Sequence, residues 1–528
     1  MPAGVQQQVT LVTEKYGGAN TALQFSQIPR EQSPLMQNAW MSKIGAIAKR
    51  PGTIPVTATP LGSPILHLTT YKASPSQSAN EDIYAASGTT LYKYDGNETL
   101  VPLTMNNPLN QADIYTVGFT NSKLTSRMII GDGGDLKECD GSVVKNVTPA
   151  ANDPSPAPKN ALSDINAKGH KFLWEYSGHV FSSPGTNEVF YSKRYEYDYW
   201  PETQYFQLIA DNDYVNGPGI AFDTVCLIPM RRGWCILTGE NFDNFDTSKF
   251  LNTTRGVVAP RSIQKVTYPN GVQTIVFLSD DEVHEVYLAV VDGGGRIYAT
   301  RSIMQGQIDF KKVGLTEEEK AAAVGFFDPE QGIYLLSFQR QGVNYTWVYD
   351  TRNGQWYPDW LTFSAKSYVM YNNVRYFAGN SGHLHKFDEN LYSDWNDKNK
   401  TSGTPVHFRR YSPLLRLEFS GYESYWDYYL IESRQWIVPS KLDVIVIFSN
   451  SSGAVDDDTN WGNTIAAWDI SPWDEAQWAN ADFTDVVNAP NRRVFKKKAK
   501  YVQVLWDNPR DEPVEIYSDK WIGRVSGL

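Results

Sequence analysis

Apolar and polar residues alternate with a period of two over most of the chain, which predicts β-strands rather than helices. The clearest stretch is residues 376–389, YFAGNSGHLHKFDE, where two alternating strands flank a Gly/Asn/Ser turn and predict a β-hairpin. Residues 83–96 and 128–141 align with this hairpin without a gap. All three copies share a leucine and, after it, an aspartate that we expect to form a turn: Leu91 and Asp95, Leu136 and Asp140, Leu384 and Asp388. Because one hairpin cannot bury its apolar face alone, the repeat predicts stacked sheets that share a core.

Further hairpins of this kind begin near His179, Trp234, Thr274 and Gly332. Successive copies are roughly 40 to 60 residues apart, and a four-stranded propeller blade needs about 40 to 50 residues. We therefore predict an all-β protein with a β-propeller of six or seven blades over residues 61–403, after an N-terminal arm over residues 1–60. The polar, turn-rich residues 391–404 mark the end of the propeller. Five strand candidates follow, which predict a β-sandwich over residues 404–528: 414–419, 428–431, 442–448, 501–506 and 514–517.

Two short helical features interrupt the strands. Residues 315–324, LTEEEKAAAV, have Thr316 as N-cap and Glu319 three residues later, which predicts a capping box. Residues 28–40 have room for a helical turn, with Ser33 as N-cap and Pro34 at the first helical position. After a short strand over 44–52, the basic pair Lys49 and Arg50 is interpreted as a solvated turn.

An aromatic insert over residues 461–486 lies within the predicted sandwich. Its aromatic residues recur every five positions between 468 and 483, a period that suits neither a helix nor a strand, so we expect a series of tight turns. Two interpretations stay open: the insert packs on its own domain, or it contacts a neighbouring subunit, since exposed tryptophan is favoured at interfaces. The tryptophans proposed as contacts are Trp461, Trp468, Trp473 and Trp478.

A basic run, RRVFKKKAK, occupies residues 492–500. It is either a solvated strand edge, where lysines block unwanted strand pairing, or a contact for an acidic neighbour or a phosphate backbone. The residues proposed as contacts are Arg492, Arg493, Lys496, Lys497 and Lys498.

Composition narrows the class of protein. A net charge of −11 argues against a protein that wraps nucleic acid, and 16 tryptophans with 31 tyrosines suit β-sheets and partner-facing surfaces. Cys139, Cys226 and Cys235 have no metal-ligand spacing, so we expect them to be reduced and structural. We also expect no signal peptide, because the first residues have no basic region followed by an apolar region, and no membrane-spanning segment, because no stretch of about 18 apolar residues occurs.

Candidate chemistry is sparse. The nucleotide-binding, zinc-protease and serine-hydrolase motifs do not occur in the sequence. His383 and His385 share a strand face, but two histidines without a third ligand favour a packed or solvated pair over a metal site. The acidic group Asp280, Asp281 and Glu282 is interpreted as a solvated hairpin tip, and residues 456–462, DDDTNWG, as an acidic turn rather than a calcium loop. We therefore predict no catalytic residues, no metal site and no cofactor.

Several segments in order resemble the tail nozzle, or tail stabilisation (tail hub), β-propeller proteins of short-tailed bacteriophages. They are the arm with KYGGAN, SPLMQN and GAIAKRPG, and the runs LIPMRRGWCILT, YTWVYDTRNGQW, FAGNSGHLHKFD and WDISPWD. The resemblance implies a non-enzymatic virion protein assembled in the host cytoplasm, forming a hexameric ring at the distal tail. It further implies a channel through which DNA passes without specific binding, and contacts with a tail adaptor protein and with fibres or spikes.

Two hypotheses of other classes stay open. A carbohydrate-binding propeller would expose tyrosines and tryptophans on a concave face. A propeller glycoside hydrolase would hold two carboxylates about 5–10 Å apart in an acidic funnel.

Overall fold

The structure is a computed structural model that describes most of the chain. The described residues are 6–42, 45–73, 81–154, 157–208, 213–239, 245–251, 253–290, 296–416, 424–433, 442–449, 463–465, 489–499 and 501–526. The protein is all-β: antiparallel sheets follow one another along the chain, and the described residues contain two short α-helices, α1 (Leu162–Asn166) and α2 (Glu317–Ala321), and two 3-10 turns (Pro260–Ser262 and Phe310–Val313).

Seven sheets, numbered here in chain order, each contain a run of four antiparallel strands, and in sheets 1 to 6 these four strands are successive in the chain. Sheet 1 contains β6 (Ile65–Tyr71), β7 (Asp82–Ser87), β8 (Thr90–Tyr94) and β9 (Leu100–Pro102). Sheet 2 contains β11 (Tyr115–Thr120), β12 (Ser126–Gly131), β13 (Lys137–Cys139) and β14 (Val143–Asn146), with β10 (Thr104–Met105) parallel to β14. Sheet 3 contains β15 (Phe172–Tyr176), β16 (His179–Ser183), β17 (Glu188–Tyr191) and β18 (Tyr205–Gln207).

Sheets 4 to 7 repeat the arrangement. Sheet 4 contains β19 (Ile220–Phe222), β20 (Val225–Pro229), β21 (Trp234–Gly239) and β22 (Phe245–Phe250), and sheet 5 contains β23 (Gln264–Thr267), β24 (Gln273–Leu278), β25 (Val283–Val290) and β26 (Arg296–Ser302). Sheet 6 contains β27 (Val324–Asp328), β28 (Ile333–Arg340), β29 (Val343–Asp350) and β30 (Gln355–Trp360). Sheet 7 contains β31 (Ser367–Tyr371), β32 (Val374–Ala378), β33 (Leu384–Asp388) and, from the N-terminal arm, β5 (Gly52–Pro55). Two further strands, β34 (Ser393–Trp395) and β35 (Gly403–Pro405), extend sheet 7 beyond β5.

The predicted repeat is confirmed at its marked residues. Leu91, Leu136 and Leu384 are fully buried. Each aspartate accepts backbone N–H groups of its own turn: Asp95 from residues 97 and 99, Asp140 from residues 142 and 143, and Asp388 from residue 390. These aspartates therefore form turns, as their position predicted. Of the other expected hairpin starts, Trp234 was placed wrongly by one strand, because it begins the third strand of sheet 4 rather than the second.

The first and last of the seven sheets contact each other. The Leu68 N–H on β6 donates to the Ser367 hydroxyl on β31 at 2.8 Å, and the Ile65 N–H donates to the Gly379 carbonyl at 3.1 Å. Apolar side chains of both sheets form one buried cluster, which includes Leu68 and Val369. A second link joins sheets far apart in the order: Arg261, just before sheet 5, donates from Nη2 to the Ile114 carbonyl ahead of sheet 2 at 2.8 Å and lies 3.1 Å from His67 Nδ1 of sheet 1.

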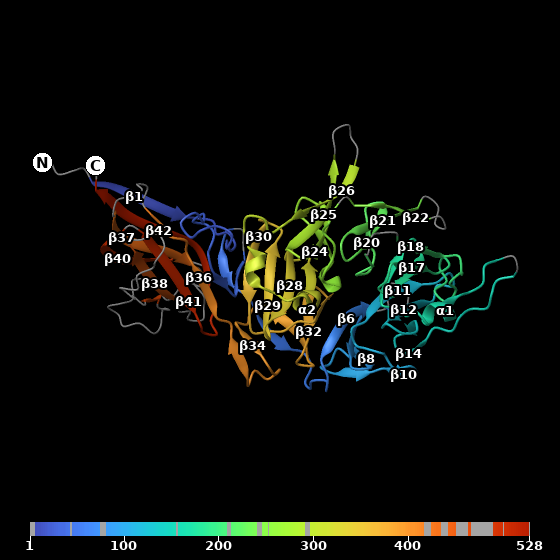
Figure 1. Cartoon of the computed structure of the whole chain (residues 1–528). Coiled ribbons are helices and arrows are strands. Elements are labelled where there is room, and N and C mark those ends of the chain that lie inside the picture. The colour runs from blue at the N-terminus through green and yellow to red at the C-terminus, as the bar shows by residue number, and fades with distance from the viewer. Residues whose placement is uncertain are drawn as a thin grey trace.

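Two more sheets share a core with each other. Sheet 8 contains β3 (Ala39–Met41), β4 (Ile47–Lys49), β42 (Glu515–Ser526), β37 (Ser424–Ser433) and β40 (Ala489–Ala499), with β1 (Gln6–Thr13) also paired to β42; sheet 9 contains β2 (Met36–Gln37), β36 (Phe408–Tyr411), β41 (Tyr501–Asn508), β38 (Leu442–Ser449) and β39 (Asn463–Ile465). Trp506 of sheet 9 donates to the Tyr429 hydroxyl of sheet 8 at 3.1 Å, inside this core. Both chain ends lie at this end of the molecule (Figure 1).

The helix predictions have different outcomes. Thr316 caps α2, and the reciprocal contacts of the capping box with Glu319 are present, as predicted. The helical turn expected at residues 28–40 is wrong, because strands β2 and β3 occupy its second half. Ser33 does not cap a helix; its hydroxyl lies 2.6 Å from both the Leu35 and the Tyr411 carbonyls and thereby ties the arm to sheet 9.

Candidate functional site

The N-terminal arm runs between the two groups of sheets, and its basic pair lies at the junction. Strand β4 pairs with β42 of sheet 8, whereas β5, three residues further on, pairs with β33 of sheet 7. Lys49 and Arg50 are thus placed where the chain leaves one group and joins the other. Both side chains are buried, so the prediction of a solvated turn is wrong.

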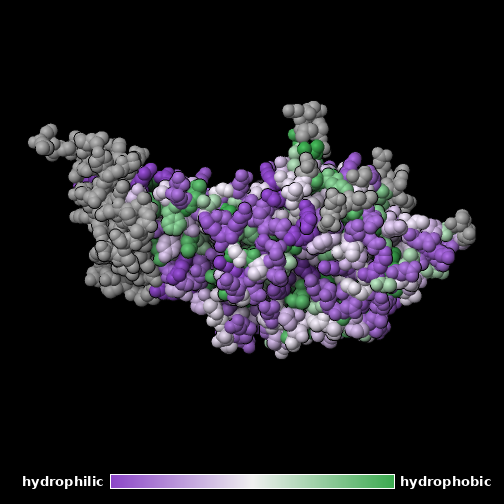
Figure 2. All heavy atoms as spheres, viewed as in Figure 1, coloured by the Kyte–Doolittle hydropathy of each residue, from purple (hydrophilic) through white to green (hydrophobic). Residues whose placement is uncertain are grey.

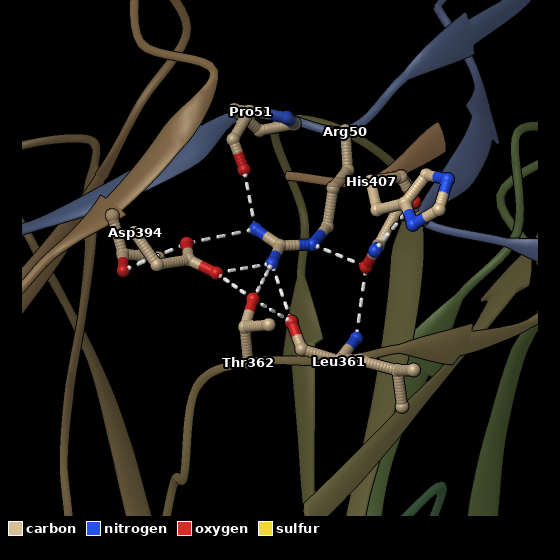
Figure 3. A network of polar contacts seen from close by, with 8 residues as sticks. Arg50, Pro51, Leu361, Thr362, Asp394 and His407 are labelled. Carbon is tan, nitrogen blue, oxygen red and sulfur yellow. Dashed lines mark hydrogen bonds and ion pairs between the residues drawn. The ribbon is translucent and has the colours of Figure 1, made fainter. Parts of the chain in front are cut away.

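Arg50 is enclosed by acceptors from several distant segments (Figure 3). Its guanidinium forms a two-armed ion pair with Asp394 of β34, with Nη1 donating to Oδ1 at 3.0 Å and Nη2 to Oδ2. Nη1 also donates to the Pro51 carbonyl at 2.8 Å, and Nη2 donates to the Leu361 carbonyl at 2.5 Å. The planar guanidinium group of an arginine donates two parallel hydrogen bonds to a carboxylate. The two bonds fix the relative orientation of the groups in addition to pairing their charges.

Asn38 supplies a further acceptor and extends the network to sheet 9. Its Oδ1 accepts from Arg50 Nε at 2.9 Å and from the Leu361 N–H at 2.8 Å, while its Nδ2 donates to the His407 carbonyl at 2.8 Å. We call the set Asn38, Arg50, Thr362 and Asp394 the arm clasp. It joins the arm to the segments that follow β30, to sheet 7 and to the start of sheet 9.

Backbone strain is concentrated beside the arm clasp. Asn38, Asp359 and Thr362 have φ values of 51°, 60° and 81°, in the left-handed region that favours glycine. Threonine is β-branched and rarely adopts this conformation, which costs on the order of 1–3 kcal/mol per residue. The Thr362 hydroxyl contacts Asp394 and lies 2.9 Å from Arg50 Nη2, so the contacts of the clasp offset this strain.

A close backbone approach next to the clasp requires glycine. Gly52 donates its N–H to the Leu391 carbonyl at 2.6 Å. A Cβ atom at this position would lie 2.2 Å from the Ser393 carbonyl oxygen. Only glycine therefore lets β5 lie against β34, which carries Asp394.

Lys49 faces the other way and binds the C-terminal part of the chain. Its Nζ donates to Asn508 Oδ1 at 2.8 Å, to the Glu512 carbonyl at 3.2 Å and to the Arg510 carbonyl. Burial lowers the pKa of Lys49 to about 7. Because successive residues of an extended chain point in opposite directions, the pair Lys49 and Arg50 links the two groups of sheets.

A pocket of about 320 Å³ opens beside the pair. Trp40 and Lys49 of the arm, Glu389 and Tyr392 of the connection between β33 and β34, and Glu515 of β42 contribute to its wall. The Ser42 hydroxyl donates to Glu515 at 2.6 Å, and Gln331 donates to Glu389 at 3.1 Å, so hydrogen bonds already occupy one oxygen of each carboxylate. This pocket lies between sheets 7 and 8, at the place where the arm connects them.

The other residues singled out by the sequence pack or pair within the fold. The rings of His383 and His385 lie 5.9 Å apart; the first contacts the Thr57 hydroxyl at 3.0 Å, the second stacks on Phe377, and burial lowers the pKa of His385 to about 4. This is the packed pair that was predicted, and the described residues give it no third ligand. The three cysteines are buried and form no disulfide bond, and burial raises the pKa of Cys139 to about 11.

The acidic group before β25 forms the hairpin turn that was expected, and Asp280 is 52% exposed there, but its carboxylates are also paired within the protein. Asp280 pairs with Arg231 at 2.7 Å, and Asp281 pairs with Arg255 at 2.9 Å and contacts His284 at 3.0 Å. Asp281, Glu282 and His284 are close enough to hold a metal ion, but Arg255 and the Ser302 hydroxyl already bind the two carboxylates. The group is therefore satisfied within the protein.

The predicted contact residues lie in the least described part of the chain. Trp461, Trp468, Trp473 and Trp478, and the acidic turn 456–462, lie outside the described residues. For Arg492, Arg493, Lys496, Lys497 and Lys498 the structure gives the backbone, which forms β40, paired with β37 at the end of the strand order of sheet 8. This position agrees with a strand edge, and the contact role stays a prediction.

The polar segment 391–404, predicted to mark the end of the propeller, contributes to the site. It forms β34 and most of β35 and contributes the buried Asp394. No helix among the described residues is long and apolar enough to cross a membrane.

Comparison with known proteins gives no assignment. No protein-family model matches the chain, and no curated protein sequence matches it. Similar solved structures are the computationally designed protein Ika8 (11% identity over 63% of this chain and 99% of that one, TM-score 0.35), a chain of the mitotic checkpoint complex (8%, 64% and 94%, TM-score 0.37) and a protein assigned as a gluconolactonase (9%, 67% and 97%, TM-score 0.29). At these TM-scores none of the three supports an inference about this chain.

Proposed function

We propose that the chain is a structural subunit of a ring at the distal end of a bacteriophage tail, where it surrounds the DNA exit channel and holds fibres or spikes. One observation carries the proposal beyond the sequence resemblance. The arm motif GAIAKRPG, which contributes to that resemblance, contains Lys49, Arg50 and Gly52, and these three residues connect the parts of the chain.

We further propose that sheets 1 to 7 form a closed seven-bladed propeller and that sheets 8 and 9 form a β-sandwich. The hydrogen bond between Leu68 and Ser367 supports closure, because it joins the first strand of sheet 1 to the first strand of sheet 7. Arg261 supports it as well: sheets 5 and 2 are not neighbours in a ring of seven, so its bond to the Ile114 carbonyl crosses the centre. In this arrangement β5 of the arm completes the last blade.

The arm clasp suits a mechanical role. A buried ion pair adds little net stability compared with apolar residues. Any arrangement that separates the two partners leaves an uncompensated buried charge, so the pair favours the one arrangement in which the partners meet. Arg50 and Asp394 are separated by 344 residues. The clasp thereby fixes the arm and sheets 7 and 9 in one relative position, as a subunit of a rigid ring requires.

The charge of the chain agrees with a conduit. Protein binding to DNA is driven by basic residues that release counterions, whereas this chain has a net charge of −11. DNA would pass through a ring of such subunits without being held.

Sedimentation of the purified full chain, alone and with the tail adaptor protein, tests the proposal. We expect a discrete assembly of six copies, formed by the chain alone or on the adaptor ring. A chain that stays monomeric at all concentrations with the adaptor ring present would refute the ring.

A carbohydrate-binding role is a second candidate, favoured by exposed tyrosines of one region. Tyr195 and Tyr205 belong to sheet 3 and the connection within it, and Tyr214 follows shortly after. Aromatic rings stack on sugars, so binding of the monomer to a glycan array, lost on Tyr205→Ala, is the expected result for this role. An array without any signal would exclude it.

A further inference from the structure

One largely buried arginine connects segments that are far apart in the chain. Hydrophilic residues, in purple, cover much of the described surface in Figure 2, where water can solvate them. Arg261 differs from these residues. It lies in the 3-10 turn between sheets 4 and 5, and its side chain is 16% exposed. Neighbouring groups of the protein must therefore satisfy its charge and its hydrogen-bond donors.

The guanidinium of Arg261 contacts sheets 1 and 2. Its Nε donates to Asp113 Oδ1 at 2.5 Å, and its Nη2 donates to the Ile114 carbonyl at 2.8 Å, both just ahead of β11. The guanidinium carbon lies 4.8 Å from the centre of the Tyr115 ring. Its Nη1 lies 3.1 Å from Nδ1 of His67 on β6. The side chain thereby links the start of sheet 5 to sheets 1 and 2.

The contact between Arg261 and His67 requires one protonation state of the histidine. Arginine has donors and no acceptor, so Nδ1 of His67 accepts the hydrogen bond from Nη1 and carries no proton. The proton of the neutral ring is then on Nε2, which donates to the Thr116 hydroxyl at 3.1 Å. A second proton, on Nδ1, removes the acceptor and places a positive charge 3.1 Å from the guanidinium nitrogen. Protonation of His67 and its contact with Arg261 therefore exclude each other.

The other charged groups around β6 do not offset this repulsion. Asp113 is bound to Arg261 and is 55% exposed. Besides β11, the described strands β7, β31 and β32 pack against β6, and their titratable or charged side chains are Asp82, Tyr84, Tyr368, Tyr371, Arg375 and Tyr376. The charged ones are paired elsewhere, Asp82 with Lys93 at 2.7 Å and Arg375 with Asp328 at 3.2 Å. Burial, together with the charge of Arg261, holds the pKa of His67 well below 6.5.

We propose that His67 and Arg261 form an acid-sensitive catch: protonation of His67 releases Arg261 and, with it, the link between sheet 5 and sheets 1 and 2. Histidine suits such a switch because its ordinary pKa is near neutrality. The pKa of His67 is lower in the linked arrangement than its ordinary value of 6.5, so the link has its full strength above pH 6.5 and weakens as the pH falls below it. This inference goes beyond the proposed ring and does not depend on it.

The backbone amide of Leu68 reports the state of the catch. It follows His67 on β6 and donates to the Ser367 hydroxyl on β31 at 2.8 Å, so it is protected from hydrogen exchange while β6 stays in place. If His67 has its ordinary pKa of 6.5 once released, proton binding raises the released population about tenfold between pH 7.5 and pH 5.5. We expect the protection of Leu68 in the full chain to fall by this factor, after correction for the intrinsic exchange rate.

A matched pair of variants separates the catch from a general effect of acid. His67→Gln takes up no proton and keeps an acceptor for Arg261, so the protection of Leu68 should be the same at both pH values. The control is His407→Gln, because His407 lies ahead of β36 of sheet 9, pairs with Asp507 at 2.8 Å and is 29% exposed. This control should retain the fall of the wild type. Unchanged melting temperatures at pH 7.5 show that the variants fold.

Arg261→Met gives a second test that does not need the histidine variant. It removes the link at every pH, so Leu68 should be less protected than in the wild type at pH 7.5 and should lose less protection on acidification. Equal protection of wild-type Leu68 at the two pH values would overturn the inference. A fall that persists in His67→Gln would also overturn it, because another group would then respond to acid. An Arg261→Met variant with wild-type protection would show that Arg261 does not hold β6.

Discussion

Substitution of Arg50 by methionine is the most informative perturbation of the arm clasp. Methionine retains the length and apolar packing of the side chain and removes the guanidinium. Asp394, which is buried and loses its cation, then keeps only hydroxyl partners such as Thr53, at 3.0 Å. Removing one partner of a buried pair costs about 3–5 kcal/mol. The Arg50 contacts to Asn38, Pro51 and Leu361 are lost as well, so we expect a destabilisation near the upper end of this range.

Hydrogen exchange of the Gly52 amide is the appropriate assay, because a chain with several cores does not unfold in one step. This N–H donates to the Leu391 carbonyl beside the clasp, so its exchange reports the opening of β5. We expect the opening free energy of Gly52 to fall by about 3–5 kcal/mol in Arg50→Met.

Arg409→Met is the matched control. Arg409 pairs with Asp507 at 2.6 Å, but its side chain is 42% exposed, and exposed pairs contribute about 0–1 kcal/mol. A double variant, Arg50→Met/Asp394→Leu, removes both charges and should recover at least half of the loss, because an apolar pair of similar volume tolerates burial. Equal effects of Arg50→Met and Arg409→Met, or no recovery in the double variant, would refute the reasoning.

Three further substitutions probe neighbouring features. Gly52→Ala should lower the melting temperature by several degrees, because its Cβ would meet the Ser393 carbonyl oxygen, whereas Gly62→Ala, whose Cβ meets nothing within 4 Å, should leave it unchanged; equal melting curves would contradict the close approach. The pKa of Lys49 is about 7 in the folded chain and near 10.5 in the unfolded chain. Between these two pH values the lysine is protonated only in the unfolded chain, so the free energy of unfolding should rise as the pH increases from 7 to 9. Urea unfolding of the wild type should show this rise and Lys49→Met should show less of it, so identical slopes would contradict the burial of a titrating lysine. Thr316→Ala should cost about 1 kcal/mol of protection at the α2 amides, measured by hydrogen exchange, because the N-cap acceptor is lost.

The repeated hairpins were predictable because their signals are local. Each turn aspartate binds amides within four residues, and each shared leucine lies within or directly before the second strand of its own hairpin. The capping box of α2 is local in the same way. The sequence predicts six or seven blades and no single number, because the central hairpins lack the shared leucine and aspartate and their boundaries depend on pairing between strands.

The arm clasp could not be predicted from the sequence. Lys49 and Arg50 have the composition of a solvated turn, and their burial depends on acceptors several hundred residues away, at Asp394 and Asn508. The polar segment 391–404 has the composition of a linker and instead contributes β34. Lys49, Arg50 and, in the segment 391–404, Asp394 are buried by contacts with residues that lie several hundred positions away in the chain. One signal was present: Gly52 directly follows Arg50 and Pro51, and a glycine at a strand start indicates a close backbone approach.

Electron microscopy of the purified full chain, with the adaptor ring added, tests the central claim most directly. We predict closed rings of six subunits around an open channel, with each subunit showing a seven-bladed disc joined to a smaller domain. Images of separate, single subunits under these conditions, or of open filaments without closed rings, would contradict the proposal.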